Sequence, residues 1–367
     1  MRFVSLLFAT AMTISPLVAV AQTASQGGPL IDYGTRFIPE IAAKGMVSGP
    51  EKLASEAGLS MLKQGGNAVD AAVATGFPLA VTLPRAGNLA GGGFMLVHLA
   101  KTDEQVFIDY REMAPASASR DMFLNEDGTV NKQMAYNSPS AAGIPGTVAG
   151  MIHALENYGT LDLKTVLQPA IELAKQGFKV PAALHLNLRA ATKRLARNEE
   201  ANRIYLAGTG TAPAMGSLFK QPDLAATLQR IRDKGTDGFY KGKTAALIVE
   251  EMQRNGGLIT RADLANYRAL ERQPVRSMFR GYELVSAPPP SSGGIHVSQI
   301  LTLLEPFPLK ELGHNSAGYL HVLIEAMKLA YADRSEYLGD PDRTAIPMTK
   351  LTSEVYLSTR RAMIKSD

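Results

Sequence analysis

The sequence predicts a fold of mixed α and β structure in one compact domain. Three observations carry this prediction. Residues 51–66 place apolar side chains at helical spacing and end on two glycines. Two apolar runs, residues 93–100 and 106–112, are joined by the polar segment KTDEQ, which is typical of a β-hairpin. A long helical pattern follows near the end of the chain, at residues 320–338.

The elements are expected in the following order. The first helix covers residues 51–66, and a second begins after Asn67. Asn67 with Asp70 three residues later forms a helix-capping pattern, and the segment that follows is almost entirely apolar, which indicates a buried helix. The hairpin of residues 93–100 and 106–112 comes next. The glycine-rich run AGNLAGGGFML, residues 86–96, leads into it.

The second half of the chain is expected to be mainly helical. We predict three helices between residues 146 and 195, a Gly/Thr-rich loop at 207–216, and helices at 223–235 and 243–257. Thr260 with Asp263 predicts the start of a short helix. Residues 275–287 are predicted as one strand that ends at PPPSSGG, before the long helix of 320–338.

The N-terminus has the pattern of a secretory signal peptide. A basic second residue and a short apolar stretch precede Ala19-Val20-Ala21, which predicts a signal peptide over residues 1–21, cleaved after Ala21. Pro16 interrupts the stretch, so a membrane anchor is disfavoured. Residues 22–44 are expected to be an N-terminal extension and residues 45–367 the folded domain. The predicted location is therefore periplasmic or secreted.

Composition excludes several classes of function. The chain has no cysteine, which excludes disulfides and thiol chemistry. The formal net charge is only +4, and the one dense basic cluster, residues 189–197, suits a solvated helix face. No nucleic-acid-binding motif accompanies it, so no nucleic-acid partner is expected. No segment after the signal peptide has the length and apolarity of a membrane-spanning helix.

Motifs that announce a catalytic centre are missing or incomplete. Ser60 to Lys63 matches Ser-x-x-Lys, but the supporting motifs of penicillin-binding enzymes are absent. The GKT at residues 242–244 lacks the first glycine of a phosphate-binding loop, because Asp237 stands there. The six histidines show no zinc-binding spacing, and no G-x-S-x-G motif occurs. We expect no cofactor and no metal site, although a triad assembled from distant residues stays possible.

Arg111 is the one residue that suggests a binding site. It follows the predicted strand directly, beside a glycine-rich loop where backbone can approach closely. Its planar guanidinium fits a carboxylate through two parallel hydrogen bonds. The alternative is a surface arginine paired with Asp109 or Glu112, since surface ion pairs are common. The residues themselves leave both readings open.

The chain resembles the large subunit of the γ-glutamyltranspeptidases, also called glutathione hydrolases, over residues 45–341. The resemblance is carried by seven stretches in order: GGNAVDAAVA, AGNLAGGGFML, DYREMAPASASRDMF, GTVAG, NGGLITRADLANY, PPPSSGGIH and YADRSEYLGDP. It implies an α+β fold, a four-layer αββα sandwich of the N-terminal-nucleophile hydrolase type. It also implies that Arg111 binds the α-carboxylate of the γ-glutamyl group, with Glu112 as a weaker candidate for ordering the arginine.

The resemblance also implies where the nucleophile lies. Family precursors cut themselves into two subunits, and the new N-terminal threonine of the small subunit attacks the γ-amide with its own α-amine as base. That threonine is not in this chain, so the chain alone is expected to be inactive and poorly stable. The family's functional serine pair also lies in the small subunit, so Ser291 and Ser292 are interpreted as structural. Ala90 stands where relatives often have glycine.

Two classes of function remain open. In the first, the chain is the large subunit of a γ-glutamyl hydrolase and transferase, whose partners are the small subunit, glutathione and other γ-glutamyl compounds, and amino acid or peptide acceptors. Related family members are cephalosporin (glutaryl) acylases with a different acyl pocket. In the second, the chain is non-catalytic, either a truncated product or an exported binding protein for γ-glutamyl compounds. A downstream threonine and small-subunit sequence would distinguish them.

Overall fold

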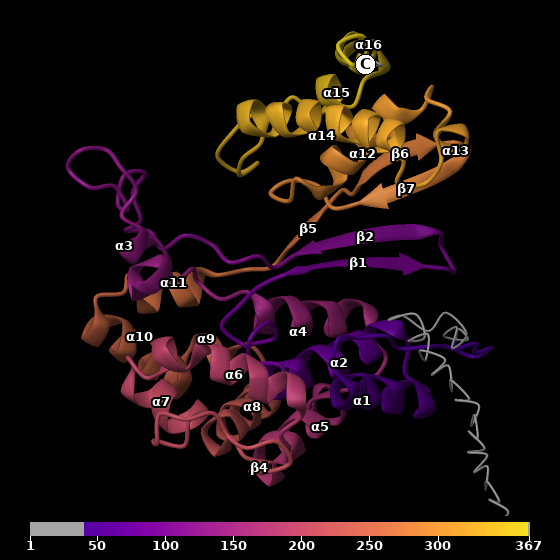
Figure 1. Ribbon diagram of the computed structural model, residues 1–367. Coiled ribbons are helices and arrows are strands. Elements are labelled where there is room, and N and C mark those ends of the chain that lie inside the picture. Colours follow the sequence, from indigo (N-terminus) through magenta and orange to yellow (C-terminus); the bar gives the residue numbers. More distant parts are fainter. Residues whose placement is uncertain (1–39, 366–367) are drawn as a thin grey trace, which may run out of the picture. The chain divides into compact units, whose positions relative to one another are not determined.

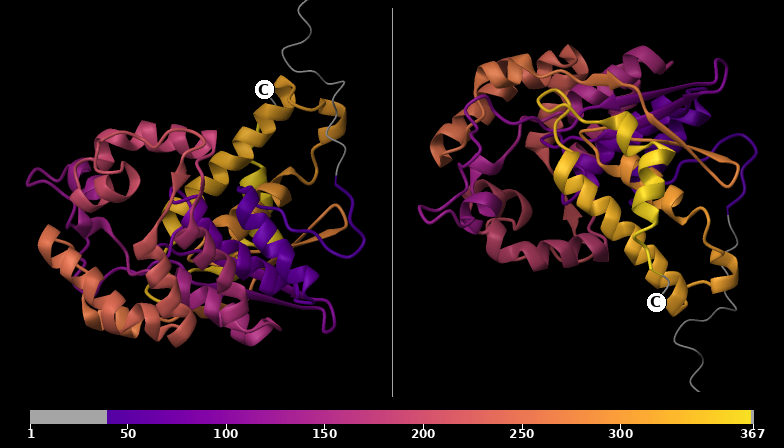
Figure 2. Two further views of the ribbon diagram at one scale, coloured as in Figure 1. Left: turned by 90° about the horizontal axis from the view of Figure 1, so that it is seen from below. Right: turned by 90° about the horizontal axis from the view of Figure 1, so that it is seen from above.

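The computed structural model describes residues 40–365 of the 367-residue chain (Figure 1, Figure 2). From Met46 onward the chain forms one compact unit that contains both helices and strands, so the prediction of mixed structure is confirmed. The predicted signal peptide, residues 1–21, and most of the predicted extension, 22–44, lie outside the described residues. None of the described helices is long and apolar enough to cross a membrane.

The first two predicted helices are confirmed as α1 (Lys52–Lys63) and α2 (Ala68–Thr82). The capping box at the start of α2 is complete, because Asn67 and Asp70 each accept a backbone N–H of the other. Asp70 is fully buried and also accepts the backbone N–H groups of Thr160 and Leu161, at 2.9 and 3.0 Å. These two residues follow α4 (Thr147–Tyr158), so one carboxylate fastens α2 to the end of α4.

The predicted hairpin is confirmed as β1 (Phe94–Leu99) and β2 (Glu104–Asp109), with a turn shorter than expected. A third strand, β5 (Leu270–Arg272), was not predicted and pairs antiparallel with β2, giving the order β1-β2-β5. Val97, Val106 and Ile108 point into the main hydrophobic core together with Phe77 of α2 and Val148 of α4. Helices α2 and α4 therefore cover one face of this sheet.

Most predicted helices of the middle segment are also confirmed. The three expected between residues 146 and 195 are α4, α5 (Leu163–Gln176) and α6 (Ala182–Leu195), and the next expected ones are α8 (Pro222–Lys234), α10 (Gly242–Asn255) and α11 (Arg261–Asn266). The elements that were not predicted here are short: α3 (Lys132–Asn137), η1 (Pro139–Ala141), β3 (Phe178–Lys179), α7 (Glu199–Tyr205), β4 (Leu218–Phe219) and α9 (Asp237–Tyr240).

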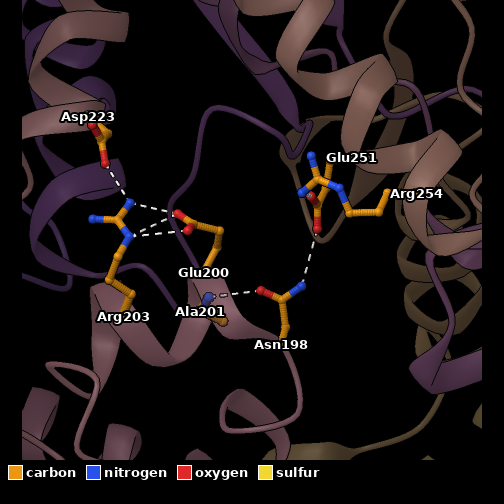
Figure 3. A network of polar contacts seen from close by, with 7 residues as sticks. All are labelled: Asn198, Glu200, Ala201, Arg203, Asp223, Glu251 and Arg254. Carbon is orange, nitrogen blue, oxygen red and sulfur yellow. Dashed lines mark hydrogen bonds and ion pairs between the residues drawn. The ribbon is translucent and has the colours of Figure 1, made fainter.

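Polar contacts fasten the short helix α7 to its neighbours (Figure 3). Arg203 on α7 pairs with Glu200 of the same helix at 2.6 Å and with Asp223 in the first turn of α8 at 2.7 Å. Asn198, which caps α7, donates to Glu251 of α10 at 3.2 Å. These contacts are solvent-exposed, so they orient α7 and contribute little to overall stability.

The prediction of a single strand at residues 275–287 is wrong, because this segment forms a hairpin of two strands. It consists of β6 (Val275–Phe279) and β7 (Tyr282–Ser286), paired antiparallel in register from Val275↔Ser286 to Phe279↔Tyr282. Arg280 and Gly281 form the turn, with φ angles of 49° and 84°. Two successive positive φ angles are what a two-residue hairpin turn of type I′ requires. The sequence pattern did not predict this turn, because its first residue is an arginine.

The C-terminal part is built around two packed helices (Figure 1). The predicted long helix is α14 (Ala317–Tyr337), whereas α12 (Gly293–Leu304), which packs on α14 and on β6, was missed. Gln299 of α12 is fully buried and donates to Asp333 of α14 at 2.9 Å. Three further short helices complete this part: α13 (Leu309–Leu312), α15 (Met348–Leu351) and α16 (Glu354–Arg361).

Candidate functional site

Arg111 lies where the β1–β2 hairpin opens into a cleft. The last residue before it, Tyr110, still exchanges two backbone hydrogen bonds with Gly93, at 3.2 and 3.0 Å. Arg111 itself is exposed and lines a cavity of about 980 Å³. The other walls come from residues 112–120, from the segment around β5, and from the loop after α14. The cleft therefore gathers three segments that are far apart in the sequence.

No carboxylate holds the Arg111 guanidinium within residues 40–365. The ion pairs there include none with Arg111, although Asp109, Glu112 and Asp342 line the same cleft. Its guanidinium carbon lies 6.0 Å from the centre of the Phe94 ring, at the outer limit of a cation–π contact. The surface ion-pair alternative with Asp109 or Glu112 is thus not what the structure shows. The guanidinium is accessible to a carboxylate from outside the chain.

Asp109 is occupied by another arginine. Arg272 on β5 donates from Nε to Asp109 Oδ2 at 2.8 Å, and its two terminal nitrogens donate to Asp342 at 3.2 and 2.7 Å. Both Asp109 and Arg272 are largely buried. The hydrogen bonds to Asp342, and secondarily those to Asp109, raise the pKa of Arg272, while Arg272 lowers the pKa of Asp342. Arg272 thus links β2, β5 and the loop after α14.

Both peptide groups of Arg111 are fixed by buried side chains. The Arg111 N–H donates to Asp109 Oδ1 at 3.1 Å, and the Arg111 carbonyl oxygen accepts from the Tyr267 hydroxyl at 2.8 Å. Tyr267 stacks on Tyr240 with ring centres 5.7 Å apart and planes inclined by 4°. Burial raises the pKa of Tyr267, so its hydroxyl remains a neutral donor across the physiological range. The backbone of Arg111 is held while its side chain stays accessible.

The glycine run Gly91-Gly92-Gly93 packs closely against the backbone around Arg111, as the sequence suggests. The Gly91 carbonyl oxygen accepts the N–H groups of Gly146 and Thr147 at 2.7 and 3.0 Å. A Cβ added at Gly92 would lie 2.6 Å from the Tyr110 carbonyl oxygen and 2.7 Å from the Glu112 nitrogen. No side chain fits there without displacing the segment that carries Arg111.

Asp263 holds the loop that follows Arg111. The predicted capping box is complete, with Thr260 and Asp263 bonded in both directions. Asp263 Oδ1 is left over and accepts the N–H of Ala116 at 3.0 Å. Burial alone would raise the pKa of Asp263, but the hydrogen bonds from Thr260 and Ala116 hold it below its usual range. The sequence showed the cap but gave no sign of the contact to Ala116.

Glu112 and Ser291, the two other residues considered from the sequence, make no polar contact with the Arg111 side chain. The Glu112 carboxylate makes no hydrogen bond or ion pair with Arg111 in the described part of the chain, and its Oε2 lies near Gly92. Ordering of the arginine instead comes from Asp109 and Tyr267. Ser291 accepts the N–H of Gly293 at 3.1 Å at the start of α12. That contact fits the structural interpretation of Ser291.

Within residues 40–365 no group of three His, Cys, Asp or Glu side chains is arranged to hold a metal ion. None of the histidines in this range is hydrogen-bonded to a serine, and His296 Nε2 has no partner there at all. His153 pairs with Glu271 at 2.8 Å, and His185 contacts the Pro213 carbonyl oxygen at 2.8 Å. His296 is buried near Tyr331, and burial lowers its pKa. None of these contacts forms a serine–histidine–acid arrangement.

A sequence model of the family described as gamma-glutamyltranspeptidase matches residues 54–367. The glutathione hydrolase proenzyme of Escherichia coli (strain K12) is 48% identical over 336 residues, which cover 91% of this chain and 58% of that protein. The acylase ACY 1 proenzyme of Pseudomonas sp. (strain SE83) is 38% identical over 342 residues, covering 92% and 61%. The chain therefore spans less than two thirds of the length of these curated relatives.

A solved structure shows the same fold. The crystal structure of Helicobacter pylori gamma-glutamyltranspeptidase superimposes with a TM-score of 0.87 at 42% identity, covering 90% of this chain and 94% of that chain. This similarity confirms the predicted fold class, an α+β fold of the N-terminal-nucleophile hydrolase type. The alignment covers nearly all of the solved chain, whereas it covers only 58% of the Escherichia coli proenzyme.

Proposed function

Because the chain belongs to the gamma-glutamyltranspeptidase family, we propose that it is the large subunit of an enzyme that cleaves glutathione and other γ-glutamyl amides. The γ-glutamyl group passes to water, or to an amino acid or peptide acceptor. Arg111 binds the α-carboxylate of this group. The observation that carries the proposal is a guanidinium that no carboxylate of the described residues binds, facing a cleft on a backbone fixed from both sides.

The nucleophile comes from the partner small subunit, made from the same precursor by self-cleavage. Its N-terminal threonine hydroxyl attacks the γ-carbonyl carbon and gives its proton to the threonine α-amine, which passes it to the departing amine. An ester of the γ-glutamyl group forms as the amide bond breaks. Water or an acceptor amine then attacks the ester and regenerates the threonine. Arg111 keeps the acyl group in place through both steps.

A stripe of apolar side chains on α14 supports the partner. Leu320, Ile324, Met327 and Tyr331 recur at helical spacing and are between 37% and 53% exposed. The opposite face of α14 is already buried through Val322 and Ala326. An exposed apolar stripe on a helix that is packed on its other side is typical of a protein contact surface. Without the partner, we expect the chain to be inactive and poorly stable.

An acylase function is the second candidate, because an acylase proenzyme is 38% identical to this chain. A glutaryl group has the same terminal carboxylate as a γ-glutamyl group but lacks the amino group. Arg111 suits either acyl group, so the choice depends on contacts to the amino group. Comparing kcat/KM of the assembled enzyme for γ-glutamyl and glutaryl amides of the same amine distinguishes the two functions.

Export is proposed from the N-terminal sequence, residues 1–21, which lies outside the described residues. The protein is then periplasmic or secreted. Mass spectrometry of the exported protein should find an N-terminus near Gln22. Export would be contradicted if the protein were found only in the cytoplasm, with residues 1–21 still attached.

The test of the proposed function is Arg111→Lys in the processed two-subunit enzyme. Lysine keeps the charge but loses the planar fork, so KM for a γ-glutamyl donor should rise about ten- to a hundredfold, from roughly 1.5–3 kcal/mol of lost contact. Self-cleavage should survive, because it needs no bound substrate. A donor without the α-carboxylate should be unaffected. Arg120→Lys is the matched control, since Arg120 lines the same cleft but pairs with Asp121.

Equal loss on both donors, or an unchanged KM, would show that Arg111 does not bind the α-carboxylate. Turnover of γ-glutamyl-p-nitroanilide by the pure 367-residue chain would show that a nucleophile lies within it.

A further inference from the structure

We propose that Arg272 is a positioning residue for substrate binding, which keeps Arg111 free by holding the Asp109 carboxylate away from it. This inference rests on the proposed function, because it assumes that Arg111 binds the substrate carboxylate. Arg272 touches neither the substrate carboxylate nor the reacting carbonyl in this proposal. It acts through Asp109 alone.

Asp109 is the carboxylate placed to form a competing ion pair with the Arg111 side chain. It precedes Arg111 by two residues, is 7% exposed and lines the same cleft. One of its oxygens already accepts the Arg111 backbone N–H at 3.1 Å. A largely buried carboxylate requires a charged or hydrogen-bonding partner. Without Arg272, the Arg111 guanidinium, two residues along the chain in the same cleft, is a cation that this carboxylate would attract.

The fold places that other cation by strand pairing. Asp109 ends β2 opposite Leu270 of β5, and Arg272 stands two residues further along β5, opposite Phe107. Arg272 Nε reaches Asp109 Oδ2 at 2.8 Å. The same guanidinium binds Asp342 through both terminal nitrogens, so its orientation is fixed from the opposite side. A bidentate contact of this kind restricts an arginine to one geometry.

The division of the two Asp109 oxygens gives Asp109 two tasks at once. Oδ1 fixes the Arg111 backbone, and Oδ2 is satisfied by Arg272. Loss of Arg272 would leave Oδ2 unpaired beside the substrate-binding cation. The carboxylate of Asp109 would then compete with the substrate carboxylate for Arg111. The expected consequence is weaker binding of donors that carry an α-carboxylate, with little change in the chemical step.

Arg272→Gln in the processed two-subunit enzyme tests this. We expect KM for the γ-glutamyl donor to rise about tenfold with kcat within about twofold, the usual scale for one charged contact. The donor that lacks the α-carboxylate should show no such rise. The double variant Arg272→Gln/Asp109→Asn should recover most of the lost affinity, because the competing charge is gone. A merely structural role predicts the opposite, an equal or larger loss in the double variant.

Arg203→Gln is the matched control. Arg203 also binds two carboxylates, those of Glu200 and Asp223, on the α7–α8 surface (Figure 3). None of these three residues lines the cleft of Arg111. Its kinetic constants should match those of the unmodified enzyme. If Arg272→Gln does not fold, Arg272→Lys carries the same test. It keeps one cation near Asp109 and should raise KM about threefold, again relieved by Asp109→Asn.

The outcomes separate this inference from the proposed function. If Arg111→Lys leaves KM unchanged, the proposed function itself fails. If Arg111→Lys raises KM but the Arg272 variants do not, or if Asp109→Asn gives no relief, the positioning role of Arg272 is wrong while the role of Arg111 stands.

Discussion

The Tyr267 hydroxyl donates a 2.8 Å hydrogen bond to the carbonyl oxygen of Arg111, across 156 positions of sequence. Tyr267 is 4% exposed and stacks on Tyr240, so the donor itself is held rigidly. The bond fixes the peptide group that follows Arg111, as Asp109 fixes the one before it. The direction of the Arg111 side chain therefore depends on a residue that does not contact the substrate in our proposal.

Tyr267→Phe removes this bond and little else. We expect the free energy of unfolding to fall by about 1 kcal/mol, because one hydrogen bond to a buried carbonyl is lost. KM for the γ-glutamyl donor should rise about two- to fivefold with kcat unchanged. Steady-state kinetics and thermal unfolding measure both effects. Tyr158→Phe, which loses a bond to Glu271, is the control and should leave KM unchanged. Equal KM values for both variants would contradict the link to Arg111.

Gly92→Ala tests the close approach beneath Arg111. The added Cβ would lie 2.6 Å from the Tyr110 carbonyl oxygen, so the backbone must shift at a cost of roughly 1–3 kcal/mol. We expect a lower melting temperature and a higher KM in the same variant. Gly339→Ala is the control, because its Cβ would meet only Thr344 at 3.5 Å or more. A Gly92→Ala enzyme with normal stability would show that the loop can yield.

The sequence predicted those parts of the fold whose signals are local. The capping boxes at Asn67 and Thr260 mark helix starts that the structure confirms, because cap and helix lie within a few residues. The missed helix α12 begins at Gly293, inside PPPSSGG, and its N-cap residue Ser292 makes no side-chain cap hydrogen bond, so the usual capping signal is missing at its start. The hairpin of β6 and β7 was missed because Arg280 occupies a positive-φ turn position that usually holds Gly, Asn or Asp.

The candidate site was predictable only in part for the same reason. Arg111 is visible beside a glycine run and at a strand end. Its supporting residues, Tyr267, Arg272 and Asp342, lie in distant segments and make contact only after the strands pair. Asp109 was considered as a partner for Arg111, which its sequence position favours. The pairing of β2 with β5 supplied Arg272 instead, and no local pattern contains that information.

Asp70→Asn should destabilise the protein in a pH-dependent way. Burial alone would raise the pKa of Asp70, but hydrogen bonds from Leu161, Thr160 and Asn67 hold it below its usual range. A lowered pKa means that the ionised carboxylate stabilises the fold above its unfolded pKa, near 4, and that this stabilisation disappears as the pH falls through the lower folded value. We expect Asp70→Asn to cost roughly 1.5–3 kcal/mol at pH 7.

Thermal unfolding between pH 7 and pH 3 measures this. The difference in melting temperature between Asp70→Asn and the unmodified protein should be constant down to about pH 5 and shrink below about pH 4. Asp162→Asn is the control, because Asp162 caps α5 through the backbone N–H of Thr165 at the surface. Its effect should be smaller, about 1 kcal/mol or less. A difference for Asp70→Asn that does not depend on pH would rule out the ionised carboxylate as the cause.

Ile324→Lys tests the apolar stripe on α14 as the contact surface for the partner subunit. Ile324 is 53% exposed on the described chain, so a lysine there costs the isolated chain little. In an assembled enzyme the same side chain would bury an unpaired charge, which is strongly unfavourable. We therefore expect weaker association of the two subunits, with the melting temperature of the large subunit alone almost unchanged. Size-exclusion chromatography of the processed protein measures the fraction that stays associated.

Glu336→Lys introduces the same charge on an exposed position of the same helix, away from the stripe, and should associate normally. Equal association of both variants would mean that the α14 stripe does not face the partner, and the surface that completes the enzyme would then have to lie elsewhere on the chain.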